Sequence, residues 1–217
     1  MRFREVAIHS AAPLEAVRFY RDGLGLPTDG DAVQAGRTRL RFVGGAPPAP
    51  YHLAFNVPAN QIRAARAWVK ERAPMLSDDI FDFDAWQAEA VYFEDVEGNV
   101  LELIARRTLQ NDVDGAFTPD MLLEVSEVGL PVADPPAAVG TLERDLGIPV
   151  YSGDRVTFSA VGDEHGLFIV VPPGRTWLPT DRRATEAPAR IVVDSPRQGV
   201  VTIGSVEIAS PGPCASP

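Results

Sequence analysis

Apolar and polar positions follow the same succession of patterns three times along the chain. A strand-like stretch comes first, a stretch with apolar residues at helical spacing follows, and further strand-like stretches complete the pattern. The opening strands are predicted at 4–10, 51–57 and 121–132, and the helices at 12–26, 58–73 and 135–148. Such repetition is typical of a fold built from copies of one supersecondary unit.

The closing strands of each copy fix the organisation of the chain. They are predicted at 31–44 (a hairpin turning at Gly36), at 90–105, and at 155–162 with 166–172. A loop rich in proline and charge, 172–188, then leads to a tail that can supply two or three strands but no helix. We therefore predict an α+β protein of repeated βαβββ units. Residues 1–110 would form one complete domain with two units, and residues 119–217 a second, reduced domain.

Glu102 interrupts an apolar run, Val100-Leu101-Glu102-Leu103-Ile104. An ionised carboxylate in a buried strand is costly unless something compensates it. An arginine such as Arg39 or Arg41, a raised pKa, or a metal ion could do so. If the turn in "EDVEGN" pairs Asp95 with Asn99, Tyr92 lies opposite Glu102 and can hydrogen-bond the carboxylate or a ligand.

Three motifs then suggest a family. They are "FYRDGLGL" (19–26), "HLAFNVP" (52–58) and "EDVEGNVLELI" (94–104). In this order and spacing they resemble the vicinal oxygen chelate superfamily, which contains glyoxalase I, extradiol dioxygenases, fosfomycin-resistance enzymes and bleomycin-binding proteins. The resemblance covers 3–108 and extends over 121–171. It implies that two units pair to form a concave trough, into which the first strands and the last strand project metal ligands.

Carried onto this sequence, the resemblance implies metal ligands at Glu5, His52 and Glu102. One imidazole and two carboxylates leave coordination positions for water and substrate, as a catalytic metal requires. We expect a divalent Mn, Fe, Ni, Zn or Mg ion, without choosing among them. The imidazole of His52 and the carboxylate of Glu102 should then lie within about 6 Å. The fourth ligand position of glyoxalase I falls on "TRLRFVG", which has no acid.

Other residues receive roles around this centre. Glu102 and Tyr92 are the predicted catalytic residues, with Glu102 or Glu5 acting as a base. Three residues are predicted to contact the substrate, namely His9, Trp86 and Asn56. His9 could also replace Glu5 as a ligand. An arginine-paired edge glutamate remains the alternative for Glu5, and an ordinary core histidine the alternative for His52.

Two residues of the second half of the chain, Glu127 and Trp177, are also considered as possible parts of a trough. Glu127 has the first-strand position of the third unit, equivalent to that of Glu5. No histidine or last-strand acid accompanies it in the sequence, so a second metal site is not expected. Trp177, on the 172–188 loop, could cover a trough of its own chain or of a partner.

Composition limits the function. The net charge of −10 argues against nucleic-acid binding and against docking on anionic membranes. No stretch reaches the roughly 18 apolar residues of a membrane helix, and the single cysteine, Cys214, cannot form a disulfide framework. With no signal peptide recognisable, a cytoplasmic protein is expected. A small-molecule substrate is expected too, and a homodimer is left open.

The resemblance implies a metal-dependent, glyoxalase-like lyase or isomerase that binds a small oxygenated substrate through two oxygens on the ion. A metal-free binding protein similar to the bleomycin-resistance members is the alternative. An extradiol dioxygenase is disfavoured, because those enzymes resemble a site of two histidines and one carboxylate.

Overall fold

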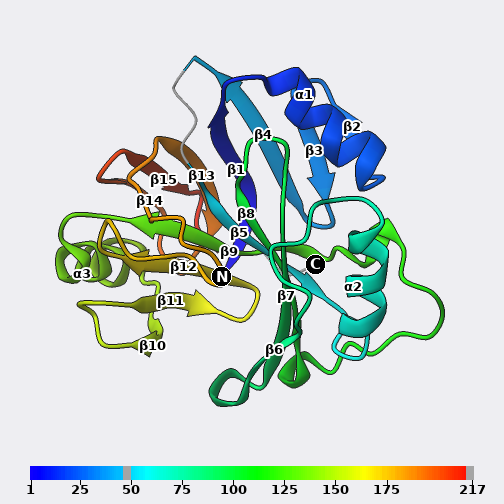
Figure 1. The fold of residues 1–217 in the computed structure, drawn as a ribbon. Coiled ribbons are helices and arrows are strands. Elements are labelled where there is room, and N and C mark those ends of the chain that lie inside the picture. The colour runs from blue at the N-terminus through cyan, green and yellow to red at the C-terminus, as the bar shows by residue number, and fades with distance from the viewer. Residues whose placement is uncertain (46–49, 214–217) are drawn as a thin grey trace.

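The structure is a computed structural model and describes residues 1–45 and 50–213. Cys214 and residues 46–49 of the predicted linker lie outside the described residues. Within the described residues, the strands form two sheets (Figure 1). Sheet 1 has the order β14 (Gly199–Ile203), β15 (Val206–Ser210), β13 (Ala189–Asp194), β1 (Arg2–Ser10), β4 (Thr38–Gly44), β3 (Ala32–Ala35) and β2 (Thr28–Asp29). Sheet 2 has the order β10 (Val150–Gly153), β11 (Ser159–Asp163), β12 (Gly166–Val171), β9 (Glu124–Pro131), β5 (His52–Val57), β8 (Val100–Arg106), β7 (Ala88–Glu94) and β6 (Phe81–Phe83).

The helices fall between the first and second strands of the first three units. Those of the described residues are α1 (Pro13–Arg18), which continues as the wider turn η1 (Phe19–Gly23), α2 (Ile62–Lys70) and α3 (Pro135–Leu146), with short turns η2 (Asp84–Trp86), η3 (Arg107–Leu109) and η4 (Pro119–Met121). Asp134 begins α3 by accepting a hydrogen bond from the Ala137 amide at 3.0 Å. Gly147, at φ 69°, ends it in the left-handed conformation that glycine tolerates best.

The α+β fold of repeated βαβββ units is confirmed. In the fourth unit, β13, β14 and β15 follow one another without a helix within residues 189–210, as the sequence predicts. Strands that the pattern did not predict are the short β2, β6 and β10, which lie at the edges of the sheets. None of the helices in the described part of the chain has the length and apolar character needed to span a bilayer.

The pairing of the units differs from the prediction. β1 pairs antiparallel with β13, so the first unit shares sheet 1 with the fourth. β5 pairs antiparallel with β9, so the second unit shares sheet 2 with the third. The two sheets therefore each combine strands from both predicted domains, 1–110 and 119–217. The expected trough between the first and second units is replaced by one between the second and third.

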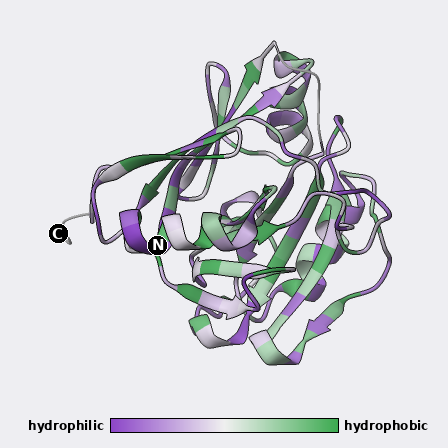
Figure 2. Cartoon of the chain, turned by 90° about the vertical axis from the view of Figure 1, so that its left-hand side faces the viewer, coloured by the Kyte–Doolittle hydropathy of each residue, from purple (hydrophilic) through white to green (hydrophobic). Residues whose placement is uncertain are grey.

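Alternation gives sheet 2 two different faces. Leu53, Phe55, Leu101 and Leu103 belong to the main hydrophobic core, which continues into sheet 1 and the helices. The intervening residues, among them Glu102, point to the opposite, concave face. Hydrophobic residues accordingly predominate in the strands, and hydrophilic ones in the loops between them (Figure 2).

Candidate metal centre

Strand register brings three polar side chains together on the concave face of sheet 2. Ala54 of β5 has Glu102 of β8 on one side and Glu127 of β9 on the other. His52 lies two residues before Ala54, on the same face of the strand. Because the alanine side chain is a single methyl group, both carboxylates can turn toward the imidazole.

The three donors are close and buried. Nε2 of His52 lies 3.6 Å from Oε2 of Glu102 and 3.8 Å from Oε2 of Glu127. All three residues are at most 6% exposed. The imidazole and the carboxylate of residue 102 thus lie well within the separation expected from the sequence. Tyr92 pairs with Glu102 across β7 and β8, which confirms the predicted register of that hairpin.

Burial and neighbouring charge separate the pKa values of the two carboxyl groups. Burial raises the pKa of Glu102 to about 8, and the Glu127 carboxylate adds to the rise. Burial acts in the same direction on Glu127, but the neighbouring His52 imidazole and the Arg106 charge outweigh it and lower the pKa of Glu127. Glu127 therefore stays ionised, while Glu102 holds a proton near neutrality in the absence of an added cation.

The same carboxylates shift the pKa values of His52 and Tyr92. Burial opposes protonation of His52, yet the neighbouring carboxylates of Glu127 and Glu102 give a net rise in its pKa. Burial, reinforced by Glu102, raises the pKa of Tyr92. Its phenol stays protonated and can donate a hydrogen bond to Glu102 or to a ligand.

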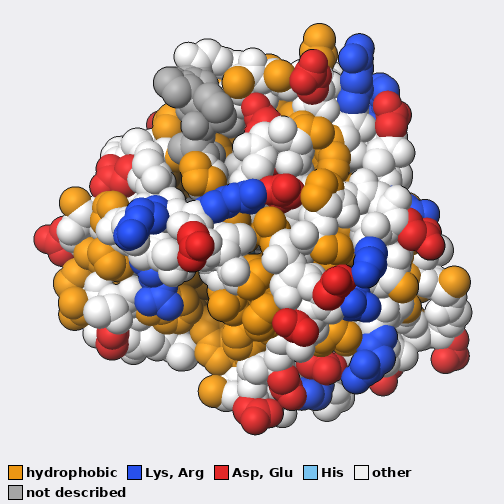
Figure 3. All heavy atoms as spheres, in the orientation of Figure 1, with side chains coloured by type: hydrophobic (Ala, Val, Ile, Leu, Met, Phe, Trp, Pro, Cys, Tyr) orange, Lys and Arg blue, Asp and Glu red, His pale blue; other side chains and the backbone are white. Residues whose placement is uncertain are grey.

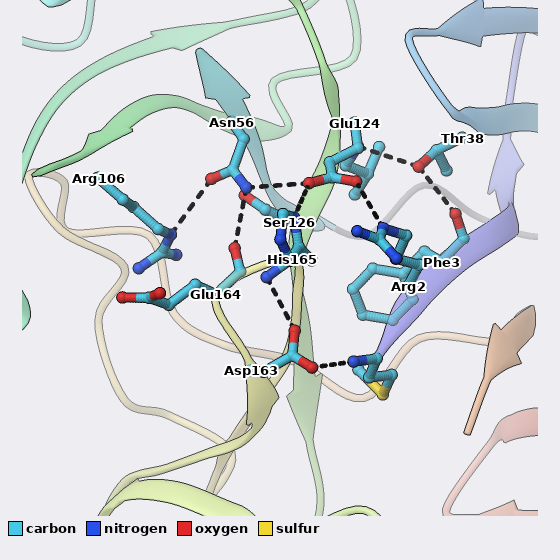
Figure 4. A network of polar contacts seen from close by, with 12 residues as sticks. Arg2, Phe3, Thr38, Asn56, Arg106, Glu124, Ser126, Asp163, Glu164 and His165 are labelled. Carbon is cyan, nitrogen blue, oxygen red and sulfur yellow. Dashed lines mark hydrogen bonds and ion pairs between the residues drawn. The ribbon is translucent and has the colours of Figure 1, made fainter. Parts of the chain in front are cut away.

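Arg106 lies behind the centre and is fully buried. Its Nη2 donates to Oε1 of Glu127, and its Nε donates to the Asn56 amide oxygen at 3.2 Å. Figure 4 shows how Asn56 continues this network: its amide nitrogen donates to Glu124, which also meets the ring of His165. Arg106 thus ties a candidate ligand to a polar network that includes the partly exposed His165 and continues through Asp163 to the N-terminus (Figure 4).

A cavity of about 280 Å³ opens in front of the three donors. Figure 3 shows hydrophobic side chains gathered in a hollow on this side of the molecule, between the β10–β11 region and β6. The cavity is lined by His52, Glu102 and Glu127, by the aromatic residues Phe83, Trp86, Tyr92, Phe158 and Trp177, and by Ile104, Ile169, Arg175, Thr176 and Leu178. It has the apolar walls and few convergent polar groups of a small-molecule site.

Trp177 covers one side of the centre. Its indole stacks on the His52 ring at 4.8 Å between centroids and 25° between planes. Space for it comes from Gly129, where a Cβ atom would lie 2.9 Å from the indole. The segment between β12 and β13 therefore covers a trough of its own chain, one of the two placements that the sequence leaves open.

Several predicted site residues lie elsewhere, and these predictions are corrected. Glu5 is on sheet 1, where its carboxylate meets Arg39, Arg41 and Arg190 at 3.6–3.8 Å. His9 lines the trough of that sheet as well. Neither therefore meets His52 and Glu102, because the first unit is in the other sheet.

Of the other predicted site residues, His52, Glu102, Tyr92 and Trp86 do come together around the cavity. Asn56 is fully buried and bonds to Arg106 and Glu124, so it supports the centre from behind. The structure adds Glu127 and Arg106, which the sequence reasoning did not assign to the site. Strand alternation could have identified Arg106, since it shares a face with Glu102 and Ile104.

The three side chains fit a divalent ion. Donor atoms bound to one ion at about 2.0–2.2 Å lie no more than about 4.4 Å apart, and both imidazole–carboxylate distances satisfy this limit. All three candidate ligand atoms lie within 4.8 Å of one another, so small side-chain rotations suffice. On β12, the position equivalent to Glu102 is Ile169, which pairs with Gly129 and has no donor atom. A bound ion would therefore keep open coordination positions.

The chain resembles known proteins in its fold and not in its sequence. No protein-family model matches the sequence, and no curated protein matches it either. Among solved structures, a candidate dioxygenase from Bacillus subtilis is similar over 98% of this chain and 86% of its own, at 17% identity and a TM-score of 0.64. A variant of glyoxalase I from Zea mays is similar over 96% of this chain and 92% of its own, at 13% identity and a TM-score of 0.57. These neighbours and the four-unit topology show that the chain has the fold of the vicinal oxygen chelate superfamily.

Proposed function

We propose that the protein is a divalent-metal enzyme of the vicinal oxygen chelate type, acting as a glyoxalase-like lyase or isomerase on a small oxygenated molecule. The observation that supports this most strongly is the meeting of His52, Glu102 and Glu127 at the inner end of a cavity. An ion held there would act as a Lewis acid for two neighbouring substrate oxygens and stabilise an oxyanion.

The two carboxylates would have different tasks. Arg106 and His52 keep Glu127 ionised, which suits a permanent ligand. Glu102, which Arg106 does not hydrogen-bond, suits a ligand that could leave the ion, accept a proton from the substrate and return it. The Tyr92 hydroxyl faces Glu102 across the strand pair and can orient that proton transfer. The aromatic walls and Trp177 would keep bulk water away from the reacting atoms.

Metal content tests this function. We expect the protein, purified without chelator and dialysed against zinc or manganese, to hold about one equivalent by elemental analysis. Glu102→Gln and Glu127→Gln should each lower the affinity by roughly a hundredfold, because each removes one of three charged or strong donors. Glu5→Gln is the matched control: it removes a glutamate at the equivalent strand position of sheet 1 and should leave metal binding unchanged.

A metal-free binding protein is the second candidate, and Arg106 is the observation that favours it. Its ion pair with Glu127 already compensates one buried carboxylate without any ion. In that case the unmodified protein and the three variants would all fail to retain Mn, Fe, Ni or Zn, while remaining folded.

A further inference from the structure

The cavity is lined by side chains of both charges. Glu102 and Glu127 are buried, and each lies close to His52. Arg175 is the basic residue that lines the cavity; it is exposed and belongs to the segment between β12 and β13, two residues before Trp177. A ligand that fills the cavity would therefore meet the buried candidate metal centre and an exposed guanidinium.

Arg175 is held in place but retains free donors. Its guanidinium carbon lies 5.1 Å from the centroid of the Phe158 ring, over the ring face. Within the described residues, its side chain makes one hydrogen bond, from Nη1 to the Thr157 carbonyl at 3.4 Å. Since no carboxylate of these residues pairs with it, the planar guanidinium can bind an anionic group of a ligand.

Arg106 makes the inner end more receptive to anions than its two carboxylates suggest. A divalent ion would be neutralised by Glu102 and Glu127 alone. Arg106, buried against Glu127, adds one further positive charge to this balance. The loaded centre would then favour an ionised oxygen donor, and Arg175 supplies a second cation on the exposed side of the cavity.

The other residues that line the cavity are mainly aromatic and apolar. Five aromatic side chains line the cavity, and the guanidinium of Arg175 extends the surface of Phe158. A cavity of about 150 Å³ accommodates benzene, so the 280 Å³ here has room for one ring with short substituents.

From this arrangement, and building on the proposed function, we infer that the substrate class is a compact aromatic acid. Its ring packs between the aromatic walls, adjacent oxygens face the metal centre, and a carboxylate at the opposite end binds Arg175. Arg175 is thus the specificity-determining residue, supplied by the segment that connects the third and fourth units.

A set of matched catechols tests the inference without requiring turnover. The probes are 3,4-dihydroxybenzoate, 3,4-dihydroxybenzamide and 3,4-dihydroxybenzylamine, which share the two adjacent oxygens and differ in the charge at the other end. Their dissociation constants are measured by isothermal titration calorimetry on the zinc-loaded and the zinc-free protein. Arg175→Gln is compared with Arg63→Gln, which removes the same charge from an exposed position of α2 away from the cavity.

We expect the carboxylate to bind the zinc-loaded protein about tenfold more tightly than the amide, and the amine to bind most weakly. Arg175→Gln should remove the preference for the carboxylate and leave both zinc uptake and amide binding unchanged. Arg63→Gln should retain the preference.

Equal binding of carboxylate and amide, a preference that survives Arg175→Gln, or zinc uptake without binding of any probe would each overturn the inference while leaving the metal centre intact. Failure of the protein to take up zinc would instead contradict the proposed function. The carboxylate preference on the zinc-free protein would then decide the role of Arg175 separately.

Discussion

The troughs of the two sheets have different side chains at equivalent strand positions. In sheet 2, His52 is on the first strand of its unit and Glu102 is on the last, beside Ala54. In sheet 1, the corresponding positions are Glu5 and Arg41, beside Ala7. The first pair faces a covered cavity and is almost completely buried, whereas the side chains of Glu5 and Arg41 are 22% and 34% exposed.

The difference shows that a strand position alone does not make a ligand. Glu5 is surrounded by three arginines that neutralise it with water still present. Glu127 has one arginine, a histidine and a second glutamate, and solvent is excluded by Trp177 and its neighbours. The second environment is buried and places three candidate ligand atoms within 4.8 Å of one another, as the proposed cation site requires.

Arg106→Met should lower the free energy of unfolding by about 3–5 kcal/mol, since it leaves the buried Glu127 carboxylate without its partner. The loss would be measured by urea denaturation monitored by circular dichroism. A loss below about 1 kcal/mol would show that Glu127 is already protonated or solvated, contrary to its lowered pKa.

Zinc affinity should rise with pH between pH 6 and 8. The pKa of Glu102 is raised to about 8 and that of His52 is also raised, so both groups hold protons at the acid end that must leave before a metal binds. The affinity should change roughly tenfold per pH unit for each proton displaced. Titrations against a competing chelator of known pH dependence measure this slope, and a flat profile would contradict the assigned ligand set.

Gly129→Ala should destabilise the protein by about 1–3 kcal/mol through overpacking, because the new methyl group would lie 2.9 Å from the Trp177 indole. Tryptophan emission should shift to longer wavelength as the covering segment moves outward. Gly140→Ala on α3, where no atom lies within 4 Å, is the matched control and should stabilise the helix slightly. Unchanged emission in the Gly129 variant would mean that the cover is not held by this contact.

Arg41→Gln on sheet 1 should have the smallest effect, less than about 1 kcal/mol in urea denaturation, because its ion pairs are partly exposed. High salt should reduce even this difference. A loss comparable to that of Arg106→Met would remove the distinction between the two troughs.

Much of the fold follows from local patterns. The alternation around Glu102 and the turn from Asp95 to Asn99 suffice to place Tyr92 opposite Glu102, because hairpin register depends on neighbouring residues only. The helix missing from the fourth unit is likewise evident from the tail composition. His52 and Glu102 belong to one unit, so their convergence needs no knowledge of how units pair.

The pairing of units could not be predicted in the same way. The periodicity of the sequence is the same whether the second unit pairs with the first or with the third. Which pairing forms depends on packing between strands that are far apart in the sequence. Glu5 and Glu127 have equivalent positions, so a wrong pairing exchanges one for the other. The contact between Trp177 and His52 is equally non-local, since it depends on the space left at Gly129.

The crossed pairing of units has a consequence for how the chain acquires its structure. β1 pairs with β13, and β5 pairs with β9. Neither sheet can therefore be completed until the second half of the chain has been synthesised. Sequence-distant contacts of this kind slow folding. We expect the polypeptide to melt as a single cooperative body rather than as two independent halves.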